Sequence, residues 1–229
     1  MKSTSTFVMS IAVALFWVST LAGQGKYMLD LTLPGGLPPP KSSSGCGPRL
    51  SAGSEGGKLV QPVLPVYIEI VRLNKGTYTM GQDLVCQISL KNVGDRALRI
   101  PWSPNPDYGN KDCTGRTKGL ATAALTGSVA LVLRSGSGVT RKILLGGLYG
   151  RLAIPQTYRT LEPGESASIK FKTRVVLYKP RAADSSTARL HLPQVFAARA
   201  EYDLDDTSQG NPYKPVYSKN RTKLSITGQ

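Results

Sequence analysis

Residues 84–95 read LVCQISLKNVGD. Leu84, Cys86, Ile88 and Leu90 alternate with mostly polar neighbours, and a period of two places these four side chains on one face of a strand. The Asn-Val-Gly-Asp end contains the residue types that favour a tight turn. We therefore expect a half-buried β-strand that ends in a turn.

The same alternation recurs along the chain. It is found in residues 66–72, 129–133, 169–175, 196–204 and 216–226. Gly, Pro and Asn separate these segments, and no amphipathic helix longer than about three turns fits the spacing. The pattern predicts an all-β domain, built as a sandwich of two antiparallel sheets.

Three pieces of the chain fit one kind of module. They are ISLKNVGD (88–95), LEPGES (161–166) and the strand entry Leu192-Pro193 with the residues that follow, to position 227. Together they resemble secreted bacterial immunoglobulin-like or fibronectin-III-like domains. The resemblance implies an immunoglobulin-like two-sheet sandwich over residues 66–227, with binding surfaces on its end loops.

The first two pieces are also similar to a proteinase-inhibitor family typified by a Bacillus intracellular inhibitor. The chain departs from that pattern because no Trp follows the Pro-Gly strand. This second resemblance implies an alternative function, a secreted proteinase inhibitor that acts through an exposed loop.

The N-terminal residues 1–22 have the layout of a secretory signal peptide. Lys2 precedes an apolar run over residues 7–18, and Thr20 and Ala22 occupy the small-residue positions of a cleavage site. We expect cleavage after Ala22, with Gly23 or Gly25 as the alternative cleavage positions. We also expect export to the periplasm or the medium, and no transmembrane segment in the mature chain. Retention of the segment as an uncleaved anchor is the alternative.

Residues 23–65 differ in composition from the rest. Between Gln24 and Pro65 there are 8 Gly, 7 Pro and 5 Ser. Such a segment buries too little apolar surface to offset the entropy of ordering it. We expect a disordered linker here, followed by one domain over residues 66–229.

The chain is strongly basic, with 29 Lys and Arg against 14 Asp and Glu, a formal charge of +15. Two rows of alternating basic residues stand out in the last third of the chain: Lys170, Lys172 and Arg174, and Lys219, Arg221 and Lys223. Such charge steers a protein toward an acidic partner, either another protein or an acidic surface polymer. No nucleic acid is expected, because aromatic residues are not interleaved with the basic ones.

Aromatic residues gather in two regions that we expect to be long loops, 102–127 and 136–160. Trp102 and Tyr108 lie in the first and Tyr149 in the second. Exposed aromatic rings can stack on a sugar or anchor a partner, so these three residues are the candidate ligand-binding set. The alternative is that they pack against the domain.

Acidic residues concentrate near the C-terminus. Asp203, Asp205 and Asp206 follow Glu201, and clustered hard oxygen ligands could hold Ca²⁺. The spacing is not that of an EF-hand. The alternative is a solvated hairpin loop.

The three cysteines are Cys46, Cys86 and Cys113. Export favours at least one disulfide, and Cys46–Cys113 is the candidate pair, with Cys86–Cys113 and no bond as alternatives. Cys86 alternates with apolar positions, so we expect its side chain to point inward.

Catalytic motifs are missing from the sequence. His191 is the only histidine, and the chain contains neither a GxSxG elbow nor a CxxC motif. We expect no enzyme activity and no cofactor. The leading hypothesis is an exported, non-catalytic interaction module.

Overall fold

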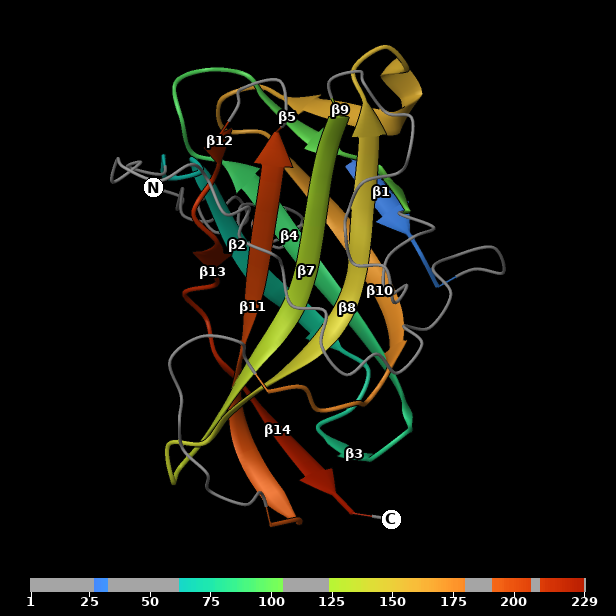
Figure 1. The fold of residues 1–229 in the computed structure, drawn as a ribbon, viewed down its shortest axis with the longest axis vertical. Helices are drawn as coiled ribbons and strands as arrows, with labels where there is room; N and C mark the ends of the chain where they lie inside the picture. The colour runs from blue at the N-terminus through green and yellow to red at the C-terminus, as the bar shows by residue number, and fades with distance from the viewer. Residues whose placement is uncertain (1–26, 33–61, 105–123, 180–190, 207–210, 229) are drawn as a thin grey trace, which may run out of the picture.

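The computed structural model describes residues 27–32, 62–104, 124–179, 191–206 and 211–228. Apart from one 3₁₀ turn, the regular structure in these ranges is β-strand (Figure 1). The prediction of an all-β fold is confirmed. No helix in these ranges is long and apolar enough to cross a membrane. The predicted signal peptide, residues 1–22, lies outside them.

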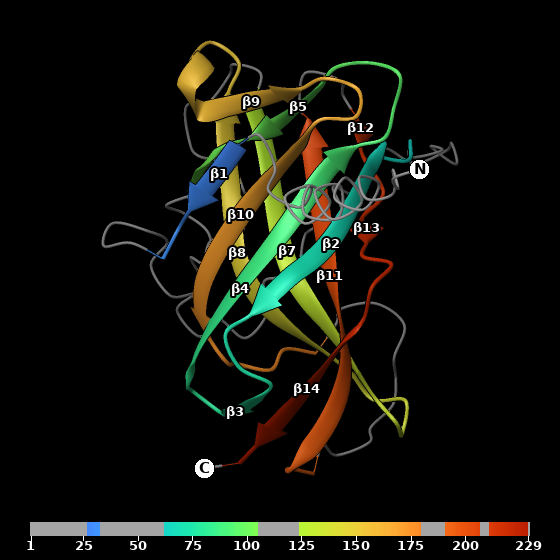
Figure 2. The same ribbon diagram turned by 180° about the vertical axis from the view of Figure 1, so that it is seen from behind.

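Four strands form the smaller of the two main sheets, which faces the viewer in Figure 2. Their order is β1 (Tyr27–Asp30), β10 (Ser166–Arg174), β4 (Asp83–Asn92) and β2 (Val66–Leu73). The β1–β10 pair is parallel, and the other two pairs are antiparallel.

Eight strands form the larger sheet. Its main path is β3 (Thr77–Thr79), β14 (Thr222–Thr227), β11 (Gln194–Asp206), β7 (Ala124–Ser135), β8 (Thr140–Arg151) and β6 (Ser103–Pro104), and β12 (Asn211–Pro212) and β13 (Val216–Tyr217) also pair with β11. A separate two-stranded ribbon consists of β5 (Leu98–Pro101) and β9 (Tyr158–Leu161), and the 3₁₀ turn (Pro155–Thr157) leads into β9.

The hydrophobic core lies where the two sheets and the ribbon meet. Leu84, Cys86, Ile88 and Leu90 of β4 are each 0% exposed, so the alternation read from the sequence identifies the inward face correctly. Residues of β2, β3, β7, β8, β10, β11, β14 and the ribbon belong to the same cluster. Burial of this much apolar surface is the main force that holds the fold together.

One region expected to be a loop is a strand. Residues 136–160 contain the whole of β8, which pairs antiparallel with β7 along its length. Two features explain why the sequence pattern did not predict this strand. Gly146 and Gly147 resemble loop residues, and an irregularity opposite Val129 and Ala130 shifts the register, so the alternation changes phase in mid-strand.

The predicted linker is not disordered throughout. Residues 27–32 form β1 and its end, and Leu31 is 6% exposed within the core. Leu64, just before the predicted domain boundary, is also buried. The linker prediction is wrong for these positions because Tyr27, Leu29 and Leu31 alternate along an edge of the small sheet and pack on its core.

Candidate functional site

The β5–β9 ribbon closes one end of the core (Figure 1). Ile100 of β5 is fully buried, and the Trp102 N–H donates to the Thr157 carbonyl oxygen at 2.8 Å. A Cβ atom at Gly150 would stand 2.7 Å from that same oxygen. Because β8 and the ribbon are in close contact, the backbone of the ribbon is held in place. The side chains that project from the ribbon therefore have well-defined positions.

Two arginines of the ribbon lie over tyrosine rings. Arg99 Cζ is 6.0 Å from the centroid of the Tyr158 ring, and Arg159 Cζ is 5.5 Å from that of Tyr27. The Tyr27 ring in turn meets Trp102 edge-on, with centroids 6.4 Å apart and an interplanar angle of 74°. Cation–π attraction holds each guanidinium in place and leaves its N–H groups available as donors.

A third pair lies beside the ribbon. The Arg151 Nε–H donates to the Tyr149 hydroxyl oxygen at 2.6 Å, and the Arg151 main-chain N–H donates to Thr157 Oγ1 at 2.7 Å. The three pairs together form what we call the arginine–tyrosine end of the molecule: Arg99, Arg151, Arg159, Tyr27, Tyr149 and Tyr158.

The arginines at this end have no acidic partner within the described part of the chain. Arg99 and Arg159 are exposed, and Arg151 is half-buried. Lysines elsewhere do form ion pairs, as Lys172 does with Asp83 at 3.0 Å. Guanidinium groups that are held by aromatic rings and have no carboxylate partner can donate hydrogen bonds to an external anion.

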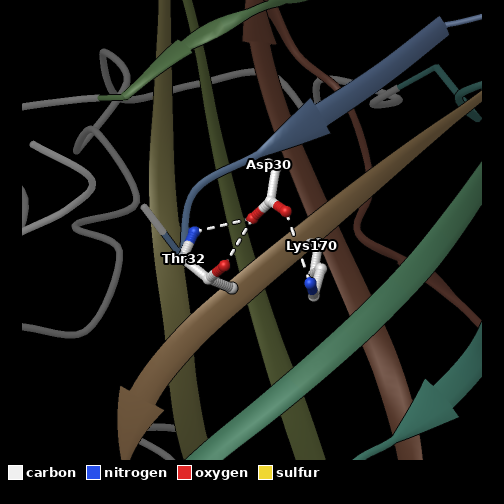
Figure 3. A network of polar contacts seen from close by, with 3 residues as sticks. All are labelled: Asp30, Thr32 and Lys170. Carbon is white, nitrogen blue, oxygen red and sulfur yellow. Dashed lines mark hydrogen bonds and ion pairs between the residues drawn. The ribbon is translucent and has the colours of Figure 1, made fainter. Parts of the chain in front are cut away.

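The strand that brings Tyr27 to this end is fastened by Asp30 (Figure 3). Asp30 Oδ1 accepts hydrogen bonds from the Thr32 N–H at 2.9 Å and the Thr32 hydroxyl at 2.6 Å. The other carboxylate oxygen, Oδ2, lies 3.3 Å from Lys170 Nζ on β10. The hydrogen bond from the Thr32 hydroxyl is the main cause that lowers the pKa of Asp30.

Not all of the aromatic residues predicted to bind a ligand are accessible to one. Trp102 is buried, with 7% of its surface exposed, and packs against Tyr27, so its ring cannot stack on a ligand. For this residue the packing alternative is correct. Tyr149 is half-buried and belongs to the arginine–tyrosine end. Tyr108 lies outside the described residues.

The acidic residues do not form the predicted metal site. They lie in β11 rather than in a hairpin loop. Asp203 and Asp205 share one face of that strand, and Asp206 projects from the other, because neighbouring strand residues alternate. Over the described ranges, no three His, Cys, Asp or Glu side chains gather where they could hold a metal ion.

Glu201 and Asp203 differ in environment from the surface carboxylates. Glu201 is buried and accepts a hydrogen bond from Lys142 Nζ at 2.6 Å. Burial raises the pKa of Asp203 to about 6, with the charges of Glu201 and Asp205 adding to the rise and Lys142 opposing it.

Cys86 carries a free thiol in the core, as its alternation predicted. Burial raises the pKa of this thiol to about 12, which makes it unreactive while the protein is folded. The Cys86–Cys113 alternative is therefore absent from this structure. Cys46 and Cys113 both lie outside the described residues.

His191 is exposed and lies three residues before the start of β11. The two predicted basic rows lie on different sheets. Lys170 is paired with Asp30, and Lys223 belongs to β14 of the larger sheet. The rows thus do not merge into one basic patch.

The sequence contained only part of the signal for the arginine–tyrosine end. Tyr149 and Arg151 are two residues apart in one strand, so a period-two search for arginine next to tyrosine would have found them. The Tyr27–Arg159 pair joins positions far apart in the chain, and Tyr27 lies in the segment expected to be linker. No local pattern could have connected these two residues.

Comparison with known proteins gives little information about this chain. No protein-family model and no curated protein matches the chain. A sporulation control protein from Bacillus subtilis is 14% identical, with 72% of this chain and 50% of that chain covered and a TM-score of 0.31. A β-glucosidase from Listeria innocua in complex with gluconolactone is 12% identical, covers 71% of this chain and 16% of its own, and has a TM-score of 0.29.

A third solved structure is an alkylpurine DNA glycosylase from Pseudomonas fluorescens bound to DNA that contains an abasic site analogue. It is 9% identical, with 71% of this chain and 30% of that chain covered and a TM-score of 0.27. The chain spans half or less of the length of these three proteins. Similarity at this level supports no argument about fold or function.

Proposed function

We propose that the chain is an exported, non-catalytic module with an immunoglobulin-like β-sandwich fold, which binds an acidic surface polymer through its arginine–tyrosine end. The observation that carries the proposal is the set of three guanidinium groups held over tyrosine rings without carboxylate partners among the described residues. The formal charge of +15 supports it by steering the chain toward acidic partners.

The fold part of the proposal rests on the largely antiparallel strands in two main sheets around a shared core. In modules of this kind, binding surfaces are found at the ends of the sheets, where loops and short strands connect the two layers. The ribbon occupies such an end.

The ligand is argued from donor chemistry. A guanidinium group has planar N–H donors that match a carboxylate or a sulfate bidentately. Tyrosine rings next to these donors offer flat apolar surface for a sugar ring. An anionic polysaccharide carries an acidic group and a sugar ring in each repeating unit. Several weak contacts along one polymer chain can therefore add up to measurable affinity.

The test measures binding of the full chain to polygalacturonate and to dextran sulfate, with neutral dextran as the control polymer. Arg99→Ala combined with Arg159→Ala is expected to weaken binding at least tenfold. The matched control, Arg221→Ala combined with Lys223→Ala, removes the same charge from exposed positions on another surface and is expected to weaken binding less than twofold. Equal losses in the two variants would mean that net charge alone is responsible, and would reject the site.

Export is tested separately. N-terminal sequencing of the protein recovered from outside the producing cytoplasm is expected to begin at Gly23, directly after the predicted cleavage position. A sequence that begins at Met1 or Lys2 would contradict cleavage.

A further inference from the structure

We infer that Asp30 is a positioning residue of the arginine–tyrosine end. By fixing the register of β1 on β10, it places the Tyr27 ring beneath the Arg159 guanidinium, which is thereby held where it binds the acidic polymer. The inference rests on the proposed function of that end and names a residue outside it on which binding depends.

Tyr27 links β1 to the arginine–tyrosine end. The other two tyrosines of that end, Tyr149 and Tyr158, belong to β8 and β9, whereas Tyr27 is the first residue of β1. Its ring meets Trp102 edge-on, with centroids 6.4 Å apart, and Arg159 Cζ lies 5.5 Å from its centroid. The position of the Arg159 guanidinium therefore depends on where β1 places the Tyr27 ring.

Apolar packing alone does not fix that place. Tyr27, Leu29 and Leu31 alternate along β1 and pack on the core, while Met28 is 55% exposed. A shift by one residue would turn the apolar side chains away from the core, so packing excludes it. A shift by two residues keeps them on the same face, because side chains alternate with a period of two. It would, however, move Tyr27 by roughly 6.6 Å along β10, farther than its ring centroid lies from Arg159 Cζ.

The ion pair of Asp30 selects one of these registers (Figure 3). In the observed register Asp30 is opposite Lys170, and its Oδ2 lies 3.3 Å from Lys170 Nζ. A shift by two residues in one direction would place Asp30 opposite Ser168, which carries no charge. A shift in the other direction would place it opposite Lys172, whose Nζ is already paired with Asp83 Oδ2 at 3.0 Å. Only the observed register gives Asp30 an ammonium group that no other carboxylate of the described residues holds.

Thr32 completes the contact. The Thr32 N–H and hydroxyl donate to Asp30 Oδ1 at 2.9 Å and 2.6 Å, directly after the end of β1. About one-third of each side chain in the Asp30–Lys170 pair is exposed, and an ion pair this exposed adds little to the stability of a fold. Its effect is on the choice between registers that bury the same apolar residues.

The test compares two substitutions that each remove one negative charge from the full chain. Asp30→Asn keeps a side-chain oxygen for the bonds from Thr32 and removes the charge that pairs with Lys170. Glu69→Gln makes the same change at an exposed position of β2, at the opposite edge of the small sheet. Because both variants are more basic than the parent chain, net charge alone predicts that both bind dextran sulfate slightly more tightly. We expect instead that Asp30→Asn weakens binding at least threefold, and that Glu69→Gln does not weaken it.

Exchange of the two charges tests the register. Asp30→Lys and Lys170→Asp are each expected to weaken binding at least fivefold, although the first variant is more basic than the parent chain and the second is more acidic. The double variant, Asp30→Lys with Lys170→Asp, has the net charge of the parent chain and should bind within twofold of it. Circular dichroism checks that each variant is folded.

The fluorescence of Trp102 reports the place of Tyr27 without any polymer. Trp17→Phe leaves Trp102 as the single tryptophan of the chain. Since Trp102 is 7% exposed and contacts Tyr27, loss of that ring should expose it to water and shift its emission to longer wavelength. In this background we expect the shift for Asp30→Asn and none for Glu69→Gln, with the urea midpoint of both close to that of the parent chain.

Any one of three results would overturn the inference. These are equal polymer binding by Asp30→Asn and Glu69→Gln, no recovery in the double variant, and unchanged Trp102 emission in Asp30→Asn. If the parent chain binds neither polygalacturonate nor dextran sulfate, the proposed function fails. The Trp102 emission and its recovery in the double variant then still decide whether Asp30 positions Tyr27.

Discussion

The side-chain amide of Asn92 donates a hydrogen bond to the main-chain carbonyl oxygen of Leu161, 2.8 Å away. The same amide donates to the Arg96 carbonyl oxygen at 2.8 Å, and its oxygen accepts from the Gly94 N–H at 2.9 Å. Asn92 is fully buried. One side chain therefore joins the end of β4, the turn that follows it and the β9 strand of the ribbon.

Replacement of Asn92 should show how much this connection contributes. Asn92→Ala leaves buried carbonyl and N–H groups without partners, and we expect the free energy of unfolding to fall by about 2–4 kcal/mol. Urea denaturation measures the change. Lys91→Ala, at the exposed neighbouring position, is the control and should change stability by less than about 0.5 kcal/mol. An equally small effect for Asn92→Ala would show that the ribbon is held by other contacts.

Gly150 tests the contact between β8 and the ribbon. A Cβ there would lie 2.7 Å from the Thr157 carbonyl oxygen and 3.3 Å from Tyr158 Cβ. Because a main-chain atom must move to make room, Gly150→Ala should lower the free energy of unfolding by about 1–3 kcal/mol. Gly136→Ala is the matched control, since a Cβ at that position meets nothing within 4 Å. Thermal unfolding of the two variants should separate them clearly, and the same midpoint for both would contradict the close contact.

Two buried tyrosines should respond differently to loss of their hydroxyl groups. The Tyr202 hydroxyl has no hydrogen-bond partner among the described residues, and burial raises its pKa. The Tyr78 hydroxyl donates to Asn74 Oδ1 at 2.7 Å and accepts from the Lys75 N–H at 3.1 Å. Tyr202→Phe should leave the free energy of unfolding unchanged or raise it by up to about 1 kcal/mol, and Tyr78→Phe should lower it by about 1–2 kcal/mol. The reverse order in denaturant titrations would refute the assignment.

The pH dependence of stability should reveal Asp203. Its pKa is about 6 in the folded chain against an ordinary value of 3.8, so between these values the folded state binds more protons than the unfolded state. Stability contributed by this group is therefore fully present below about pH 4 and is lost as the pH rises through 6. Asp203→Asn should flatten this part of the curve and raise the free energy of unfolding at pH 7 by roughly 1–2 kcal/mol.

Asp95→Asn, a change at an exposed carboxylate, is the control for that measurement. Urea titrations at pH 4, 5, 6 and 7 give the comparison. If Asp203→Asn keeps the slope of the parent chain, burial of this carboxylate is not the cause of the pH dependence.

The all-β class was predictable because the strands that form the core keep strict alternation. Leu84 to Leu90 is the clearest case, and its four inward residues are all buried. β8 was missed because Gly146 and Gly147 weaken the strand signal and the register shift breaks the period. Composition alone misjudged β1, since a few ordered residues are hidden in a segment rich in Gly and Pro.

Site residues were harder to predict than strands. The sequence marks Tyr149, but it cannot distinguish Trp102 in the core from Trp102 on a surface, because an aromatic ring suits either place. Asp203, Asp205 and Asp206 look like a ligand set when they are counted along the chain. Because successive residues of the pleated strand β11 point to opposite sides, Asp206 lies on the opposite face from Asp203 and Asp205.

By itself, the sequence determined the strand class, the inward face of β4 and the burial of Cys86, because these follow from local alternation. Only the tertiary structure decided that Tyr27 meets Trp102 and Arg159, and that Asp30 meets Lys170. Those contacts join segments more than 70 residues apart in the chain. They depend on which strands become neighbours, and strand order is set by how all the apolar faces are buried together rather than by any one segment.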